Sequence, residues 1–252
     1  MQPAMKNYKL LIQYDGTRYY GWEHQPGKDT IQGKIETVLT RMCGLPEDSP
    51  VEVIGAGRTD AGVHAKGMVA NVRLDVKMTE ESIRDYLNRY LPEDIAVLDV
   101  REASDQFHAR YKAVGKTYRY TCYAGRVKPV FDRKYVLVLE KMPDVEKMRR
   151  AAEYLIGKWD YKSFCGNSHM KKSTVRVVDS IEIRCKKDYI TFTYHGTGFL
   201  QNQIRIMTGT LLEVGRGAYE PEHVKEIRDA LDRTAAGPTA DACGLCLMEV
   251  DY

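Results

Sequence analysis

The chain has 252 residues, of which 43% are hydrophobic and 29% are charged, and its formal net charge is +3. This composition fits a globular protein with a substantial core, built as one large domain or as two closely packed halves. No apolar stretch reaches the roughly 18 residues of a membrane span, and residues 1–6 lack the apolar region of a secretory signal. We therefore expect a cytoplasmic protein without a membrane partner.

The first half of the chain alternates predicted strands with predicted helices. Thr30 is a suitable N-cap for a helix whose apolar stripe ends near Met42, and Gly44 can end that helix. Thr79 is a suitable N-cap for a second helix, with two glutamates in its first turn where the helix dipole favours negative charge. The apolar stripe of the second helix consists of Ile83, Leu87, Tyr90 and Leu91. Strands are predicted at residues 9–14, 51–54, 69–74 and 95–100.

The second half repeats this order loosely. Strands are predicted at residues 116–123, 135–139, 175–184, 189–194 and 244–250. Helices are predicted at residues 145–156, 200–214 and 221–231. We therefore predict an α+β fold with two pseudo-duplicated halves, residues 1–105 and 106–252, around one mainly antiparallel sheet. A central cleft between the two halves would be the natural binding site.

The six cysteines are scattered through a chain that is too long to need disulfide bonds for stability. Cys243 and Cys246 have the C-x-x-C spacing, but a zinc site would need two more ligands, and no second close pair of cysteines exists. A thioredoxin-like redox motif should open a helix, whereas Leu245, Leu247 and Val250 predict a strand. We interpret the cysteines as thiols that fill apolar space.

Positive charge is concentrated in residues 101–134, which contain nine Lys and Arg residues but only three acidic residues. Such a segment is typical of a groove that binds a polyanion, but a solvated basic face would have the same composition. Charge alone leaves both interpretations open. The basic residues are Arg101, Arg110, Lys112, Lys116, Arg119, Arg126, Lys128, Arg133 and Lys134.

Residues 55–65 contain the most informative motif, in which three glycines permit positive φ angles and close approach of another backbone. Arg58 and Asp60 are two residues apart, so both side chains point the same way if the loop is extended. His64 follows four residues later. An arginine can keep a carboxylate ionised and oriented through a two-pronged hydrogen bond. The Asp60 carboxylate could then act as a nucleophile or a general base.

Other interpretations of this loop remain open from these residues alone. Glycine-rich turns with aspartate often cap a helix or close a hairpin, and an Arg–Asp pair is often only a salt bridge. A phosphate-binding P-loop is excluded because no Gly-Lys-Ser/Thr sequence follows. A metal-dependent nuclease would need several clustered carboxylates, and none lie nearby in the sequence.

Residues 57–64, with the sequence Gly-Arg-Thr-Asp-Ala-Gly-Val-His, resemble the active-site motif of the tRNA pseudouridine synthase A family, whose essential aspartate matches Asp60. The resemblance extends over nearly the whole chain, with matching blocks in the same order as in the family. It implies the pseudouridine synthase fold. The other blocks are residues 14–22, 91–95, 107–110, 116–120, 196–200, 204–205, 209–211, 214–217, 236–240 and 244–245.

The resemblance also implies a set of roles for individual residues. The target uridine lies in a stacked stem and must be flipped out before its glycosidic bond can be reached. Arg58 would help to hold the flipped state, and Tyr118 would pack against the uracil face. Arg205 would lie near the catalytic Asp60, and Leu245 would line the uracil pocket.

In the implied reaction the N1–C1′ bond breaks, the base turns and a C5–C1′ bond forms. Asp60 either attacks covalently or removes a sugar proton, and the sequence does not choose between these roles. No redox step or group donor is needed, so no cofactor and no metal are implied. Arg110, Lys116 and His64 are further candidates for substrate binding. The implied partner is tRNA, with modification at positions 38 to 40, and the implied assembly is a homodimer.

Several residues depart from the family pattern. The departures are Glu23 and His24, which follow the block at residues 14–22 (the opening motif), together with Met68, residues 201–203 and residues 241–243. Because these positions are expected near the binding cleft, isomerisation of another structured RNA remains an alternative. A non-catalytic RNA-binding protein is a second alternative, and the intact catalytic set argues against it.

Overall fold

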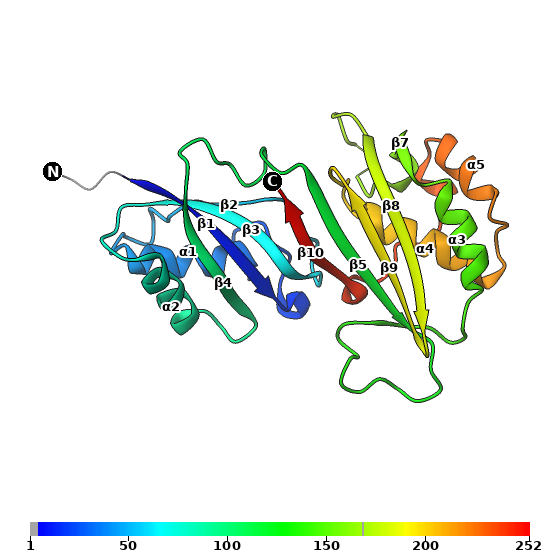
Figure 1. The fold of residues 1–252 in the computed structure, drawn as a ribbon, viewed down its shortest axis with the longest axis horizontal. Coiled ribbons are helices and arrows are strands. Elements are labelled where there is room, and N and C mark those ends of the chain that lie inside the picture. The colour runs from blue at the N-terminus through cyan, green and yellow to red at the C-terminus, as the bar shows by residue number, and fades with distance from the viewer. Residues whose placement is uncertain (1–4, 168) are drawn as a thin grey trace. The chain divides into compact units, whose positions relative to one another are not determined.

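The computed structural model describes residues 5–167 and 169–252, which divide into two compact units (Figure 1). Unit 1 consists of Met1–Val114 together with Leu247–Tyr252, and unit 2 consists of Gly115–Cys246. The predicted boundary after residue 105 lies nine residues before this division. The last six residues belong to unit 1 because the C-terminal strand returns to it.

Unit 1 contains a sheet with the strand order β4-β1-β3-β10, and β2 also pairs with β3. The ladders that join β1 to β3, β1 to β4 and β2 to β3 are antiparallel. Helices α1 and α2 pack against each other, and α2 packs on β4. The elements are β1 (Lys6–Tyr14), η1 (Gly16–Arg18), α1 (Ile31–Met42), β2 (Val53–Gly55), β3 (His64–Leu74), α2 (Glu80–Tyr90), β4 (Ile95–Ala103) and β10 (Leu245–Asp251).

The two helices of unit 1 begin where the sequence predicts. The Thr30 hydroxyl accepts a hydrogen bond from Gly33 N at 3.2 Å, and the Thr79 hydroxyl accepts one from Ser82 N at 3.2 Å. Gly44 follows α1 with a φ of +65°. The assignment of Tyr90 to the buried stripe of α2 is wrong, because its ring is exposed at the helix end and packs on Tyr86, with centroids 4.6 Å apart.

Unit 2 has the strand order β5-β9-β8-β7, with antiparallel ladders, and the short strand β6 pairs with β5 in parallel. Helix α3 packs against α4 and β8. The elements are β5 (Gly115–Tyr123), β6 (Leu137–Val138), α3 (Val145–Glu153), β7 (Gly157–Asp160), η2 (Lys162–Phe164), β8 (Val175–Lys186), β9 (Tyr189–Gly196), α4 (Gln203–Arg216), α5 (His223–Asp229), η3 (Arg233–Ala235) and η4 (Ala242–Gly244).

The predicted α+β class and the mainly antiparallel pairing are confirmed. In unit 2 the predicted hairpin around residues 186–188 is confirmed, with Lys187 at a φ of 53° in its turn. Strand β7, which begins at Gly157, was not predicted, and α3 ends at Glu153 rather than at residue 156. Helix α4 begins at Gln203 rather than residue 200, because Asn202 has a left-handed backbone.

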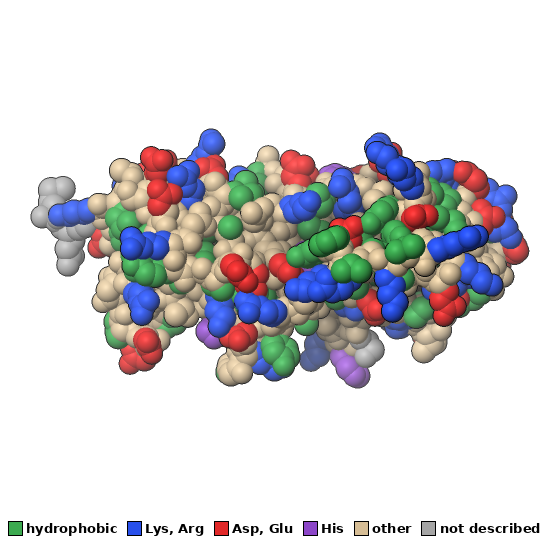
Figure 2. Space-filling view, turned by 90° about the horizontal axis from the view of Figure 1, so that it is seen from below, with side chains coloured by type: hydrophobic (Ala, Val, Ile, Leu, Met, Phe, Trp, Pro, Cys, Tyr) green, Lys and Arg blue, Asp and Glu red, His purple; other side chains and the backbone are tan. Residues whose placement is uncertain are grey.

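A long loop joins β5 to β6 and extends below the rest of unit 2 in Figure 1. Figure 2 looks onto this face from below and shows hydrophobic side chains among Lys and Arg side chains over that part of unit 2. Within the described residues, no helix has both the length and the apolar character that a membrane crossing requires.

Each unit contains one of the two tryptophans of the chain. Trp22 in unit 1 is buried, with 2% of its surface exposed. Trp159 in β7 is 40% exposed, and its indole N–H donates to Ile156 O at 2.9 Å. The guanidinium carbon of Arg228 lies 3.8 Å from the centre of the Trp159 ring, which is a cation–π contact.

The core of unit 2 buries several groups that ionise only at alkaline pH. The Tyr120 hydroxyl donates to Asp241 O at 2.7 Å, the Tyr161 hydroxyl donates to Leu155 O at 2.7 Å, and the Tyr194 hydroxyl bonds Thr208 at 2.8 Å. Burial raises the pKa of all three phenols, and it raises the pKa of the Cys122 thiol to about 12.

We expect the free energy of unfolding to fall at alkaline pH. Below the ordinary pKa values of these groups, 9.0 for cysteine and 10.0 for tyrosine, both states are protonated and the stabilisation is fully present. As the pH rises further, the unfolded chain loses these protons before the folded one, so stability is lost. Urea unfolding at about pH 8 and about pH 11 measures the difference. Tyr194→Phe removes one titrating phenol and should make the difference smaller, whereas equal stability at both pH values would contradict the prediction.

Candidate active site

The loop that carries Asp60 joins β2 to β3 in unit 1. Val63 N donates to Asp60 O at 3.1 Å, which closes a turn, and Gly62 within that turn has a φ of +79°. Strand β3 begins at His64, five residues earlier than predicted, so the end of the motif lies in the sheet. Asp60 is half-buried in this turn. The loop is therefore a defined structure between two strands.

The opening motif, residues 14–22, packs directly against this loop, and two glycines make the packing possible. A Cβ on Gly16 would lie 2.0 Å from Val63 O, and a Cβ on Gly21 would lie 2.5 Å from Thr59 O. Gly21 also has a φ of +92°, which side chains rarely permit. The two backbones are thus closer than any other residue would allow.

Hydrogen bonds fix the same contact. Trp22 N donates to Thr59 O at 3.1 Å, and the hydroxyls of Tyr14 and Thr59 lie 2.8 Å apart in the core. Gly16 N donates to Nδ1 of His64 at 3.1 Å, and the His64 ring is buried. In unit 1, His64 therefore positions the opening motif. Its predicted role in substrate binding stays a prediction.

Asp94 anchors the opening motif from its other side, and sequence reasoning did not single it out. Its carboxylate accepts from Arg18 Nε at 2.7 Å and from the Tyr19 hydroxyl at 2.6 Å, and its carbonyl accepts from Asp15 N at 2.9 Å. Burial, together with this carboxylate, raises the pKa of Tyr19. In the sequence, the one feature that points to Asp94 is its position in the block at residues 91–95, which matches the family.

Arg58 does not make the two-pronged bond to Asp60 that an extended loop would allow. Its Nη2 lies 2.5 Å from Oε1 of Glu23 instead, and the two side chains are 65% and 45% exposed. The physical reason is that Asp60 opens a turn, so the loop is not extended there. An ion pair this exposed adds at most about 1 kcal/mol to stability. Glu23, a departure from the family pattern, is thus the partner that sequence reasoning missed.

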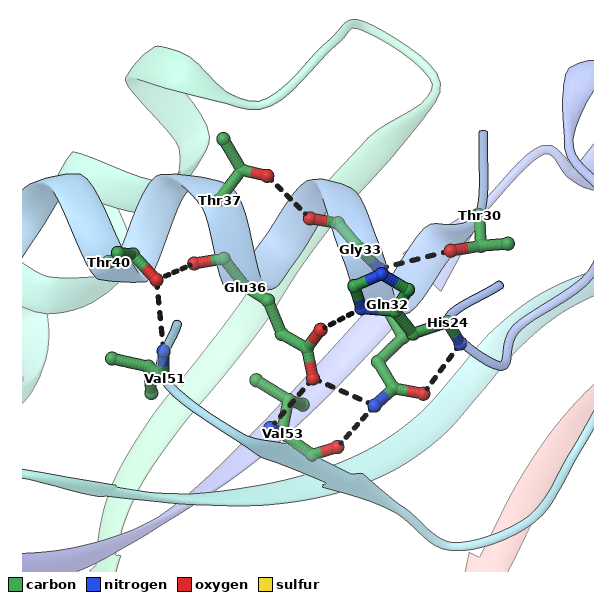
Figure 3. A network of polar contacts seen from close by, with 9 residues as sticks. All are labelled: His24, Thr30, Gln32, Gly33, Glu36, Thr37, Thr40, Val51 and Val53. Atoms are coloured by element: carbon green, nitrogen blue, oxygen red, sulfur yellow. Dashed lines mark hydrogen bonds and ion pairs between the residues drawn. The ribbon is translucent and has the colours of Figure 1, made fainter. Parts of the chain in front are cut away.

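A second departure, His24, belongs to a polar network that joins the segment after the opening motif to α1 and to Val53 of β2 (Figure 3). The buried Glu36 carboxylate lies 2.9 Å from Nδ1 of His24 and accepts from Gln32 Nε2 at 2.8 Å and from Val53 N at 3.1 Å. These bonds satisfy a carboxylate that would otherwise be costly to bury. His24 therefore contributes to the scaffold of unit 1.

Two other departures lie in the protein core. Met68 on β3 is fully buried, and Gln203 is 1% exposed, with its Oε1 accepting from Leu200 N at 2.8 Å. Gln201 is exposed. The changes at Met68 and Gln203 are therefore changes in packing, which bear less on RNA contacts than the sequence suggested.

In unit 2, Tyr118 lies on β5 opposite Tyr194 of β9. Its ring is mostly buried and meets Phe199 edge to face, with centroids 5.6 Å apart and an interplanar angle of 87°. Tyr118 and Tyr120 are buried on one face of the strand and Arg119 is exposed on the other, as predicted from alternation. Phe199 is a second aromatic group at this position, and the block at residues 196–200 contained it.

Arg205 lies in the first turn of α4 and is held by unit 2. Its Nε donates to Ala240 O at 2.7 Å, and its Nη1 donates to Asn202 Oδ1 at 3.0 Å. Ala240 N donates back to Arg205 O at 3.1 Å. The guanidinium is thus oriented by two carbonyl-type oxygens rather than left to rotate. Leu245 is buried at the start of β10.

The basic residues of the segment 101–134 are mostly at the surface. Lys116 on β5 is half-buried and the other eight, including Arg110, are exposed. Arg101 pairs with Asp99 at 2.7 Å. Exposure is compatible with both interpretations of this segment, so its role in RNA binding stays a prediction.

The C-x-x-C pair lies where η4 passes into β10, and the predicted strand is confirmed. The Cys243 thiol donates to Val136 O at 3.4 Å, and burial raises its pKa. In the described part of the chain, no three His, Cys, Asp or Glu side chains are grouped so that they could hold a metal ion.

Comparison with known proteins gives consistent matches. The family described as tRNA pseudouridine synthase matches residues 10–112 and 151–252. The tRNA pseudouridine synthase A of Bacillus sp. (strain KSM-64) is 46% identical over 98% of this chain and 100% of that protein. The protein of the same name from Clostridium kluyveri is 44% identical over the same shares of the two chains. The tRNA pseudouridine synthase A 2 of Clostridium perfringens is 41% identical, again over 98% and 100%.

We expect Gly16→Ala to destabilise unit 1, because the new Cβ would force the Val63 carbonyl and the loop behind it to move. Overpacking of this kind costs about 1–3 kcal/mol. Gly198→Ala is the matched control, since a Cβ there meets nothing within 4 Å. Urea unfolding followed by circular dichroism measures both variants. Equal stability of Gly16→Ala and Gly198→Ala would show that the contact does not constrain the loop.

Proposed function

The chain belongs to the tRNA pseudouridine synthase family, and on that premise we propose that it isomerises uridine to pseudouridine at positions 38 to 40 of the tRNA anticodon arm. It is an isomerase, and tRNA is its substrate class. We further propose which residues bind the uridine and catalyse the reaction.

The observation that carries the assignment of residues is the placement of Asp60. Its turn is braced by the Gly16–Val63 and Gly21–Thr59 contacts, by the Trp22–Thr59 hydrogen bond and by the buried His64. A group that must attack C1′ or remove a sugar proton has to be held in position before the substrate arrives. A carboxylate carried on a short turn with a braced backbone meets this requirement.

Arg58 supports the same role from the surface. Because its guanidinium is largely exposed and its only ion pair within the described residues is the exposed one with Glu23, it can exchange that partner for a phosphate of the flipped nucleotide. Arginine forms strong two-pronged bonds with phosphate. We assign Arg58 to holding the flipped-out state.

The residues of unit 2 keep the roles that the resemblance implies. We assign Tyr118, whose ring meets that of Phe199 edge to face, to stacking on uracil. Arg205, whose guanidinium donates to Ala240 O and Asn202 Oδ1, keeps the role near the catalytic carboxylate that the resemblance implies. Leu245 supplies apolar surface for the base.

Binding of the RNA backbone and the oligomeric state complete the proposed function. Arg110 and Lys116 are assigned to the RNA backbone, where basic side chains release counterions on binding. The proposed working form is a cytoplasmic homodimer that acts without a cofactor. The reaction needs no co-reactant, because the N1–C1′ bond breaks, the C5–C1′ bond forms, and the proton lost from C5 is matched by the proton gained at N1.

The first test of this function is Asp60→Asn, which keeps the shape of the side chain and loses the charge. We expect release of tritium from tRNA labelled at C5 of uridine to fall to background, because C5 loses its hydrogen only when the isomer forms. Circular dichroism should show an unchanged fold. Asp105→Asn, which removes an exposed acid of unit 1, is the control and should retain normal release. Substantial turnover by Asp60→Asn would exclude the assignment.

The second test concerns Tyr118. Its stacking on the base is realised after flipping, so its loss should lower turnover more than affinity. With stacking worth about 1–3 kcal/mol, we expect Tyr118→Ala to lower the single-turnover rate about tenfold or more, with near-normal tRNA affinity. Tyr118→Phe keeps the ring and should retain most of the rate, unless the hydroxyl takes part in proton transfer at C5.

Stability measurements separate this role of Tyr118 from a purely structural one. The ring packs on Phe199, so Tyr118→Ala also leaves a cavity. A rate that recovers when the assay is run well below the unfolding temperature would assign Tyr118 to the core. Equal losses of rate and affinity would make it a general RNA contact.

A further inference from the structure

The connection between β5 and β6, residues 124–136, is a loop with internal hydrogen bonds, which we call the Phe131 loop. Asp132 N donates to Pro129 O at 3.1 Å, and Tyr135 N donates to Asp132 O at 2.7 Å, so the chain turns twice at its tip. The Arg133 guanidinium also donates to Val130 O. These bonds give the tip a defined backbone.

Two tyrosines at the adjoining ends of β5 and β9 tie the loop to the sheet. The Tyr123 hydroxyl donates to Val127 O at 2.7 Å, and the Tyr189 hydroxyl donates to Asp132 Oδ2 at 2.5 Å. The two rings meet edge to face, with centroids 4.9 Å apart. The bond to Asp132 raises the pKa of Tyr189 to about 12. The loop is therefore tied at two points to the adjoining ends of β5 and β9.

This anchored loop presents apolar side chains to solvent. Phe131 is 91% exposed, and Val127 and Val130 are also mostly exposed. In the described residues, Phe131 has no ring–ring or cation–π contact. A phenylalanine held outward on a hydrogen-bonded turn contributes nothing to the core. With Val127 and Val130 it makes three large apolar side chains exposed on one short loop, and a group of exposed apolar side chains is typical of a site of interaction.

Four basic side chains belong to the same loop as the exposed ring. The loop contains Arg126, Lys128, Arg133 and Lys134 against the single acid Asp132, and all four cations are exposed. The carboxylate of Asp132 is occupied by Tyr189. Figure 2 shows this mixture of hydrophobic and basic side chains on the lower face of unit 2. An exposed aromatic ring among cations is the combination that binds bases by stacking and the backbone by charge.

We infer that the Phe131 loop is a second RNA contact, in which Phe131 stacks on an unpaired base and the four cations hold the flanking phosphates. The inference rests on the proposed function, which supplies RNA as the ligand. A second copy of this chain is the other possible occupant. It is disfavoured, because an interface between two identical loops would place two positive clusters against each other.

The test measures the affinity of tRNA for variants made in an Asp60→Asn background, so that no turnover occurs during binding. Stacking worth about 1–3 kcal/mol corresponds to a rise in Kd of roughly 5-fold to 150-fold for Phe131→Ala. Phe131→Tyr keeps the ring and should bind like the parent. Leu231→Ala removes another exposed apolar side chain of unit 2 and should also bind like the parent.

Salt dependence separates stacking from charge. Phe131→Ala should leave the slope of log K against log salt as it is, whereas Lys128→Gln should make it shallower by about one counterion. Unchanged Kd for Phe131→Ala would overturn the inference. A halved mass of Phe131→Ala in sedimentation, with unchanged Kd for tRNA, would assign the loop to a second copy instead.

Tritium release by the wild-type enzyme is measured in parallel. If the wild type is active and Phe131→Ala binds normally, the loop inference fails alone. If the wild type releases no tritium, the proposed function fails, whatever the binding data show.

Discussion

Unit 1 depends on one contact between two backbones, which joins residues 16–21 to the loop of Asp60. At Gly16 and Gly21 no room exists for a Cβ, so the two segments meet through main-chain atoms alone. These contacts fix the backbone of the loop that carries Asp60. The buried His64 and Thr59 then satisfy the polar groups that the contact encloses.

This constraint explains why sequence blocks far apart in the chain belong together. Within unit 1, Asp94 binds Arg18 and Tyr19, so the block at residues 91–95 supports the opening motif, which in turn supports the loop of Asp60. Within unit 2, Arg205 and Ala240 exchange two hydrogen bonds, which join α4 to the block at residues 236–240. In both units, the two blocks stabilise each other through these hydrogen bonds.

The elements that depend on local chemistry were predictable, and those that depend on distant partners were not. Thr30 and Thr79 cap their helices through bonds three residues away, and the β8–β9 hairpin turns at the polar residues where prediction placed it. Arg58 was predicted to bind Asp60 because the two are close in sequence, yet its partner is Glu23, 35 residues away. Asp94 and Phe199 were within recognised blocks, but their specific bonds require tertiary structure. Tyr90 was misplaced because the helix ends under it, which exposes a position that a continuing stripe would bury.

The placement of the two tryptophans gives the protein a built-in optical reporter for each unit. Trp22 is buried beside the loop of Asp60, and Trp159 is partly exposed beneath the cation of Arg228. An indole in an apolar environment emits at shorter wavelength than one in water, so the two residues should contribute separable bands. A single Trp→Phe replacement at either site would leave one tryptophan. Excited at a wavelength that the 17 tyrosines do not absorb, its emission then follows the unfolding of one unit. Comparing the unfolding transitions of the two variants by intrinsic fluorescence thus measures the cooperativity between the two units without an added label.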